Sequence, residues 1–212
     1  YYQQSIELYN TFIKKDSSET KLNTIAKCYD KLEKPDSALI YRKIIAMQDI
    51  ENQNNTIALA QNLLSMEQPD SALIYLCRYT SIDSTDLNIN RLKAYAYNQA
   101  GLHQDAIKLY QKIRQSGDRQ ASTEYYLGLS YAYTDSLSQA YDCLVRANNL
   151  SERKNAYILS QLGVIGSKIG MIKESQQDIK DALDLLQPDK QLVTSLYETA
   201  ATNHIQLHQY KD

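Results

Sequence analysis

The residue types that most often carry chemistry are few in this sequence and poorly spaced for it. His204 and His208 lie four residues apart, a spacing that can bind zinc on one helix face. Neither a cysteine pair nor an acidic partner accompanies them in the sequence, so we expect no metal site. Cys28, Cys77 and Cys143 are far apart and are interpreted as small residues on helix faces. The sequence leaves a disulfide between Cys28 and Cys77 undecided, and the redox compartment is undecided for the same reason.

One segment has some likeness to a phosphate-binding loop. The residues from Gly163 to Lys168 read Gly-Val-Ile-Gly-Ser-Lys, whereas a phosphate loop needs Gly-Lys-Ser/Thr after a strand. Here the residues lie inside a helical pattern, and the sequence carries neither a nucleophile elbow nor a paired-histidine motif. We therefore predict that the protein is not an enzyme and holds no cofactor.

The composition limits the classes of protein that fit. The 212 residues are 43% hydrophobic, and 23 Lys and Arg balance 25 Asp and Glu, for a net charge of −2. This balance provides no basic surface for phosphates, so nucleic acid is not the expected partner. The sequence has no run of about 18 apolar residues, the length that a transmembrane helix needs. Six Gly and three Pro are too few for a typical all-β fold, while 18 Tyr beside one Phe are unusual.

The elements that position the side chains follow from an internal repeat. The seven residues 35–41 recur unchanged at 69–75, an offset of 34 residues. The same offset leads from Ala72 to Ala106 and from there to Ala140. Within each period apolar residues fall three and four apart in two stretches, a spacing typical of amphipathic helices. Each period is thus predicted to be a helix, a short turn and a second helix.

Local signals place the helix ends. Gly101 interrupts the pattern between two helical stretches. Pro35 and Pro69 lie where the second helix should start, a position that tolerates proline, and the aspartates that follow them can cap free amide groups.

On these residues the chain resembles the tetratricopeptide repeat, which has small and aromatic residues at fixed places in 34 positions. The resemblance implies an all-α fold, a right-handed superhelical solenoid of antiparallel helix pairs, as a single domain over 1–212. The matching residues are Ala94, Tyr97, Gly101, Ala106, Tyr110 and Ile113 in one unit, and Leu127, Gly128, Tyr131, Ala140, Leu144 and Ala147 in the next. The expected units are a second helix in 1–17, repeats at 18–51, 52–85, 86–119, 120–154 and 155–189, and a partial repeat at 190–212 that follows an insertion around Pro188.

Two departures from the pattern carry expectations. Glu33 and Glu67 replace the glycine between the helices of the first two repeats, so we expect looser turns there. The sequence begins at Tyr1 and stops at Asp212, in the middle of an expected helical unit, so both ends look cut. The cut ends give the chain a possible route to self-association.

The resemblance implies a binding surface for a protein or peptide. In this family the first helices line a concave groove, and we expect that groove to bind a peptide or partner protein. The variant that grips a terminal carboxylate with Lys and Asn is not expected, because their order is absent here. The groove residues expected from the repeat positions are Asn54, Gln61, Asn88, Arg91, Tyr95, Asn98, Tyr125, Leu129 and Tyr133.

Two further interpretations stay open. The Asp-Ser-Ala-Leu-Ile-Tyr segments are similar to repeats in bacterial sensor proteins, which would make the chain a regulatory part of a larger signalling protein. An assembly or transport accessory of the cell envelope, anchored as a lipoprotein, is the other. Both favour an envelope location over a cytoplasmic one.

Overall fold

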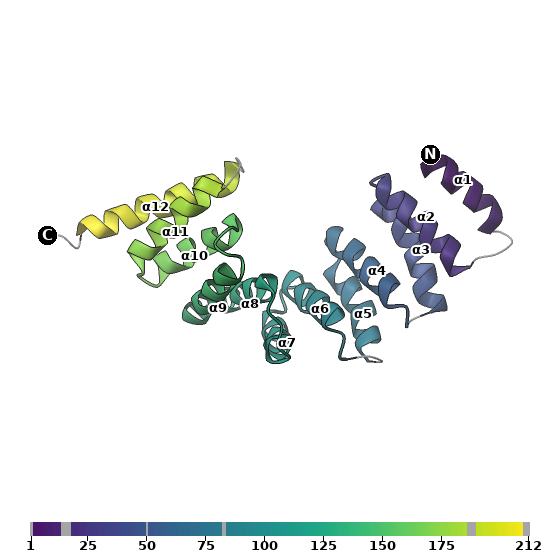
Figure 1. Ribbon diagram of the computed structural model, residues 1–212, viewed down its shortest axis with the longest axis horizontal. Helices are drawn as coiled ribbons and strands as arrows, with labels where there is room; N and C mark the ends of the chain where they lie inside the picture. Colours follow the sequence, from purple (N-terminus) through teal and green to yellow (C-terminus); the bar gives the residue numbers. More distant parts are fainter. Residues whose placement is uncertain (1, 14–17, 50, 82–83, 186–189, 210–212) are drawn as a thin grey trace. The chain divides into compact units, whose positions relative to one another are not determined.

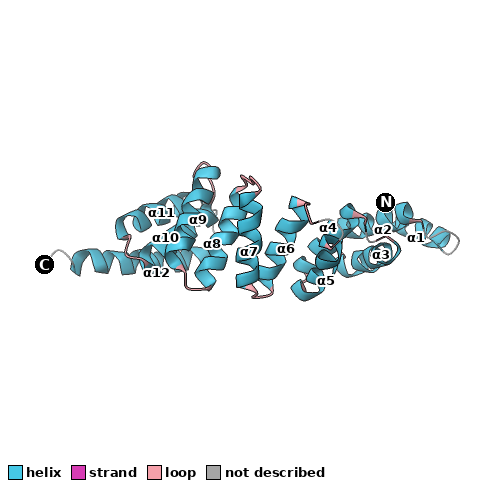
Figure 2. Ribbon diagram, turned by 90° about the horizontal axis from the view of Figure 1, so that it is seen from below, coloured by secondary structure: helices cyan, strands magenta, loops and turns pink. Residues whose placement is uncertain are grey.

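The structure, a computed structural model, describes residues 2–13, 18–49, 51–81, 84–185 and 190–209. The described residues form twelve helices and contain no strand (Figure 1, Figure 2). The chain divides into two compact units, Tyr1–Leu102 and His103–Asp212, and each is described by itself. The boundary falls inside the expected repeat at 86–119, between its two helices.

The first unit contains six helices. Helix α2 packs on α3, α4 packs on α5, and each following helix lies against the pair before it. The second unit repeats this arrangement in the pairs α8–α9 and α10–α11, with α12 against α10 and α11. The first unit's helices are α1 (Tyr2–Ile13), α2 (Glu19–Lys31), α3 (Pro35–Gln48), α4 (Gln53–Ser65), α5 (Pro69–Thr80) and α6 (Leu87–Gln99). The second unit's are α7 (His103–Gln115), α8 (Ala121–Tyr133), α9 (Leu137–Leu150), α10 (Ala156–Lys168), α11 (Ile172–Leu185) and α12 (Lys190–Gln209).

The helix starts agree with the sequence signals in part. Pro35 and Pro69 are the first residues of α3 and α5, as predicted. Asp36 and Asp70 lie in the first turn, where a carboxylate is favourable near the helix amides, but neither helix has a side-chain cap. Their predicted role as caps is therefore wrong.

The turns between paired helices share one geometry. Their central residue is left-handed in every pair, with φ of 55° at Glu33 and Glu67, 59° at Asp135, 74° at Gly101 and 84° at Gly170. The amide after this residue donates to the carbonyl five residues before it, over 2.8–3.0 Å, as in a Schellman motif. The expectation of looser turns at Glu33 and Glu67 is wrong, because the hydrogen bonds hold these non-glycine residues in the same conformation.

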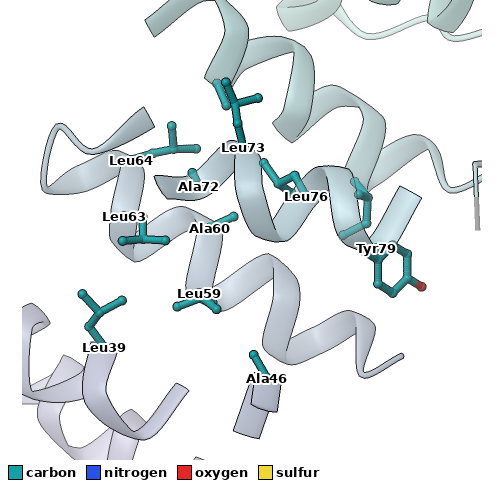
Figure 3. Close-up of a cluster of buried hydrophobic side chains, with 12 residues drawn as sticks. Leu39, Ala46, Leu59, Ala60, Leu63, Leu64, Ala72, Leu73, Leu76 and Tyr79 are labelled. Carbon is teal, nitrogen blue, oxygen red and sulfur yellow. The ribbon is translucent and has the colours of Figure 1, made fainter. Parts of the chain in front are cut away.

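Small residues allow the paired helices to pack closely. Ala38, Ala72, Ala106 and Ala140 are fully buried, and Figure 3 shows Ala72 among leucines of the first unit's core. In the second unit, Gly128 of α8 faces α9, the helix that carries Ala140, and a Cβ added to Gly128 would lie 3.0 Å from Cγ of Leu144. The alanine ladder predicted from the sequence thus marks helix crossings with little spare room.

A serine takes the alanine's place in the pair α10–α11. Ser175 is fully buried, and its hydroxyl donates to the Gly163 carbonyl oxygen over 2.6 Å. Asn203 of α12, also fully buried, donates from Nδ2 to Ser175 Oγ over 2.8 Å. Ser167 donates to Asn203 Oδ1 over 2.5 Å. This hydrogen-bonded chain fixes how α12 lies on α10 and α11, because buried polar groups need their partners. Pro188, at the expected insertion, and Tyr210, in the expected partial repeat at 190–212, lie outside the described residues.

Candidate functional site

The predicted surface residues fall into two sets, one in each unit. Six belong to the first unit, with Asn54 and Gln61 on α4 and Asn88, Arg91, Tyr95 and Asn98 on α6. Three belong to the second unit, where Tyr125, Leu129 and Tyr133 lie on α8. Within each unit these residues come from first helices of the pairs.

The first set is mostly polar and partly exposed to solvent. Asn54, Gln61 and Asn88 are exposed, whereas the side chains farther along α6 are half-buried. The Arg91 guanidinium donates from Nη2 to Asn88 Oδ1 over 2.6 Å. The Tyr95 hydroxyl accepts from Gln99 Nε2 over 2.5 Å. The surface therefore combines amides, a guanidinium and one aromatic ring, the groups that hydrogen-bond a peptide backbone and its side chains.

Gln61 also lines a pocket of about 410 Å³ between the α2–α3 turn and α4. Arg42, only 4% exposed, lies at this pocket and donates from Nη1 to Asp30 Oδ1 over 2.9 Å. A second bond joins Arg42 Nη2 to the other oxygen of Asp30, and Asn62 Oδ1 accepts from Nη1 as well. The bidentate pair joins α2 to α3 and, through Asn62, to α4.

The sequence reasoning missed Arg42, although the repeat carries a signal for it. Four residues after each alanine of the ladder, the later repeats have Leu76, Tyr110 and Leu144, all buried. Arg42 occupies the same position in the first repeat. A charged residue at a core position must be paired when it is buried, so the departure predicts a partner such as Asp30.

The second set forms an aromatic surface. Tyr133 is 71% exposed, and its ring stacks on His103 with ring centroids 4.4 Å apart and planes 6° apart. Tyr157, on α10, is 57% exposed. Burial, together with the nearby hydroxyls of Tyr126, Tyr133 and Tyr157, raises the pKa of Tyr125 to about 12. These three tyrosines therefore lie close enough to Tyr125 to act on its charge, and Tyr125 stays protonated at neutral pH.

Two residues of these sets also pack against the buried core. Tyr95 packs against the buried cluster of the first unit, and Tyr125 packs against a cluster whose buried residues belong to α9 and α10. These two rings contribute to the core as well as to the surface. Arg91 and Tyr133 are therefore better positions than Tyr95 and Tyr125 for testing binding by truncation.

The three cysteines and His204 lie on four different helices of the described chain. All three cysteines are free thiols, with Cys28 and Cys143 buried and Cys77 exposed. Burial raises the pKa of the Cys143 thiol, mainly by desolvation, which disfavours the reactive thiolate. His204 is exposed, while the His208 side chain lies outside the described residues. No group of three metal-ligating side chains occurs among the described residues.

Two other expectations concern longer segments. Residues 163–168 lie within α10, a regular helix, where Gly163 meets Ile179 of α11. The segment is therefore part of a helix crossing and not a phosphate loop. Within the described ranges, none of the helices is both long enough and apolar enough to cross a membrane.

Comparison with known proteins places the fold. No protein-family model matches the sequence, and no curated protein matches it either. Among solved structures, MamA from Desulfovibrio magneticus RS-1 is 15% identical and covers 80% of this chain and 95% of its own, with a TM-score of 0.73. TTC0263, a thermophilic TPR protein in Thermus thermophilus, is 18% identical and covers 86% of this chain and 98% of its own, with a TM-score of 0.65.

A third similar structure is the APC/C hetero-tetramer Cut9–Hcn1. The match is 13% identical and covers 95% of this chain but 40% of that one, with a TM-score of 0.73. The described helices, the repeat of 34 residues and these similar structures agree. The chain has the tetratricopeptide-repeat fold, an all-α solenoid of antiparallel helix pairs.

Proposed function

We propose that the protein is a non-enzymatic scaffold that binds a peptide or partner protein on the exposed faces of its first helices. The observation that carries the proposal is the aromatic stripe of α8, where Tyr133 is 71% exposed and follows Tyr125 and Leu129 at four-residue spacing. Tyrosine is among the residue types that most often anchor protein interfaces, because it offers a large apolar face and a hydroxyl. The similar structure of Cut9–Hcn1 is, by its description, a hetero-tetramer, which supports a role in assembly.

The first unit adds a polar surface to the proposal. Asn88 and Arg91 lie three residues apart on α6 and are already hydrogen-bonded to each other. Arg91 is therefore held in place before a partner arrives, which lowers the entropy lost on binding. Gln61 lies on the neighbouring first helix, α4, beside the pocket at Arg42. An extended peptide with neutral or acidic side chains suits this combination of amides and guanidinium.

A display library of random peptides tests the proposal. Binders selected on the purified protein are titrated against the Arg91→Ala and Tyr133→Ala variants. We expect a loss of about 1–3 kcal/mol in at least one of the two, since truncation of an anchor residue has this effect. Lys108→Ala, at an exposed position of α7, is the control and should bind as the unchanged protein does.

The proposal fails if the selected peptides lose affinity only for variants of the second helices. It also fails if Arg91→Ala and Tyr133→Ala bind every selected peptide as tightly as the unchanged protein. A thermal melt of each variant separates loss of binding from loss of folding. Tyr133 makes its main contacts at the surface, so its truncation should leave the melting temperature nearly unchanged.

We also propose that the chain self-associates through α12. Tyr197, Ala201 and Ile205 follow one another at four-residue spacing on α12, and all three are exposed, Tyr197 by 61% and Ile205 by 58%. The stripe adjoins a pocket of about 420 Å³, lined in part by Leu183 of α11. Sedimentation of the unchanged protein and of Ile205→Asp over a range of concentrations tests this. A concentration-independent monomer in the unchanged protein would refute it.

A further inference from the structure

We propose that the aromatic surface of the second unit, formed by His103, Tyr125, Tyr133 and Tyr157, binds a proline-rich segment in the polyproline II conformation. The inference rests on the proposed binding function and names the class of partner for one of its two surfaces. The residues come from three helices of one compact unit, α7, α8 and α10. The second unit therefore presents them together.

The first argument is the shape of the surface. Tyr133 and Tyr157 keep 71% and 57% of their area exposed, so their rings offer open faces to a partner. The stacked pair of His103 and Tyr133, with planes 6° apart, holds the Tyr133 ring in one orientation. Proline has a compact, rigid ring that packs on flat aromatic faces, and aromatic-lined surfaces are a general means of binding polyproline II segments. Because both partners are already rigid, little conformational entropy is lost on binding.

The second argument is the match of hydrogen-bonding groups. A polyproline II segment makes no internal hydrogen bonds, so its carbonyl oxygens need donors, and each proline lacks an N–H group. A protonated tyrosine hydroxyl is such a donor. The hydroxyls of Tyr133 and Tyr157 lie near that of Tyr125, whose pKa of about 12 keeps it protonated at neutral pH. Donors without charge fit a segment that is rich in acceptors and also without charge.

The third argument is the spacing. Tyr125 and Tyr133 lie eight residues apart on α8, which corresponds to about 12 Å along the helix axis at about 1.5 Å per residue. A polyproline II segment advances about 3.1 Å per residue, so about four residues span that distance. Leu129 lies midway between them in the sequence of α8 and would add an apolar contact for the bound segment. A proline-rich segment of roughly six to eight residues would therefore cover the surface on α8 and reach Tyr157.

The test uses an octaproline peptide with a terminal fluorophore, and a Gly/Ser peptide of the same length and label as its control. Fluorescence anisotropy measures binding to the whole protein and to three variants. Tyr133→Ala and Tyr157→Ala should each weaken octaproline binding about tenfold, the effect of losing one aromatic anchor. Tyr2→Ala, which removes an exposed tyrosine on α1 of the first unit, should leave the affinity unchanged.

A fourth variant examines the hydroxyl at a ring that also packs in the core. Tyr125→Phe keeps the ring and its packing but removes the donor. We expect a loss of about two- to tenfold in octaproline affinity, the effect of one hydrogen bond, with an unchanged melting temperature. An unchanged affinity would remove the hydrogen-bonding argument.

The outcomes separate this inference from the broader function. If octaproline and the Gly/Ser peptide bind equally, or if octaproline does not bind, the inference is refuted. The binding function still stands in that case if library-selected peptides depend on Tyr133. If neither octaproline nor any selected peptide depends on Tyr133 or Arg91, both proposals are refuted.

Discussion

Gly163 is where the close packing of the helix pairs can be tested most directly. A Cβ added there would lie 2.5 Å from Cγ1 of Ile179, whereas non-bonded carbons pack at about 3.5–4.0 Å. Cγ1 is next to the branched Cβ of Ile179 and cannot swing away alone, so α10 and α11 must separate by about 1 Å. Overpacking of this kind costs about 1–3 kcal/mol. Alanine gains about 1 kcal/mol over glycine in a helix interior, so Gly163→Ala should lose up to about 2 kcal/mol net.

Gly166 provides a matched control on the same helix. Its added Cβ would meet Tyr141 Cε2 at 3.3 Å and Ser175 Cβ at 3.4 Å, distances that a small shift can relieve. The same gain in helix propensity applies, so Gly166→Ala should be neutral or stabilising by up to about 1 kcal/mol. Urea unfolding followed by circular dichroism measures both variants. Equal free energies of unfolding for the two variants would refute the argument.

A double-mutant cycle identifies the contact itself. Ile179→Ala removes Cγ1 and destabilises the protein alone, because it leaves a cavity at a side chain that is 2% exposed. In that background Gly163→Ala should no longer destabilise and should gain about 1 kcal/mol from helix propensity. The coupling free energy between the two positions should therefore be about 1–3 kcal/mol. A coupling near zero would show that Ile179 is not the reason for glycine at this position.

Three further predictions follow from the turns, the ladder and a buried carboxylate. Glu67→Gly should stabilise the protein by about 0.5–1 kcal/mol in urea unfolding, because a left-handed φ of 55° strains a residue with a Cβ. Ala106→Leu should cost about 1–3 kcal/mol because Ala106 is fully buried, whereas Lys108→Leu should cost under about 0.5 kcal/mol. Equal melting temperatures for the two variants would contradict the ladder. Burial raises the pKa of Asp178 above its ordinary 3.8 despite the hydrogen bond from Arg153, so the folded state holds this proton more tightly than the unfolded state. The contribution of Asp178 to the free energy of unfolding is then greatest below pH 3.8 and is lost as the pH rises through the folded-state pKa. Urea unfolding measured across the acidic range should show this loss of stability in the unchanged protein and not in Asp178→Asn.

The fold could be predicted because the repeat records packing constraints directly. Each helix crossing needs a small residue, and the alanines at 34-residue spacing are those small residues, all of them fully buried. The turn geometry was less predictable from residue type. Glycine is the usual residue at a left-handed position, yet Glu33 and Glu67 adopt the same conformation. Schellman hydrogen bonds and the packing of the two helices offset the strain at these residues.

Buried polar partners were beyond the reach of the sequence. Asn203 lies on α12, after an insertion that breaks the repeat register, so its pairing with Ser167 and Ser175 could not be inferred from spacing. Arg42 departs from the apolar pattern, so the sequence can flag it as a buried charge. Its partners Asp30 and Asn62 lie on two other helices, α2 and α4, and cannot be identified from the pattern. Such networks depend on distances between helices, which a pattern of residue types does not contain.

Tyr125 and Tyr133 lie on one stripe of α8 but have different surroundings. Four residues turn an α-helix by about 40° more than a full circle, so a stripe at four-residue spacing winds slowly around its helix. From Tyr125 to Tyr133 the drift is about 80°, which accounts for the different surroundings of the two rings. Tyr125 packs against the buried cluster, while Tyr133 is 71% exposed and stacks on His103. The same spacing that predicts a common face thus places a half-buried ring at one end of the stripe and an open aromatic ring at the other. The open end, extended by Tyr157 of the next first helix, offers a partner the larger exposed area, and Tyr125 offers the smaller.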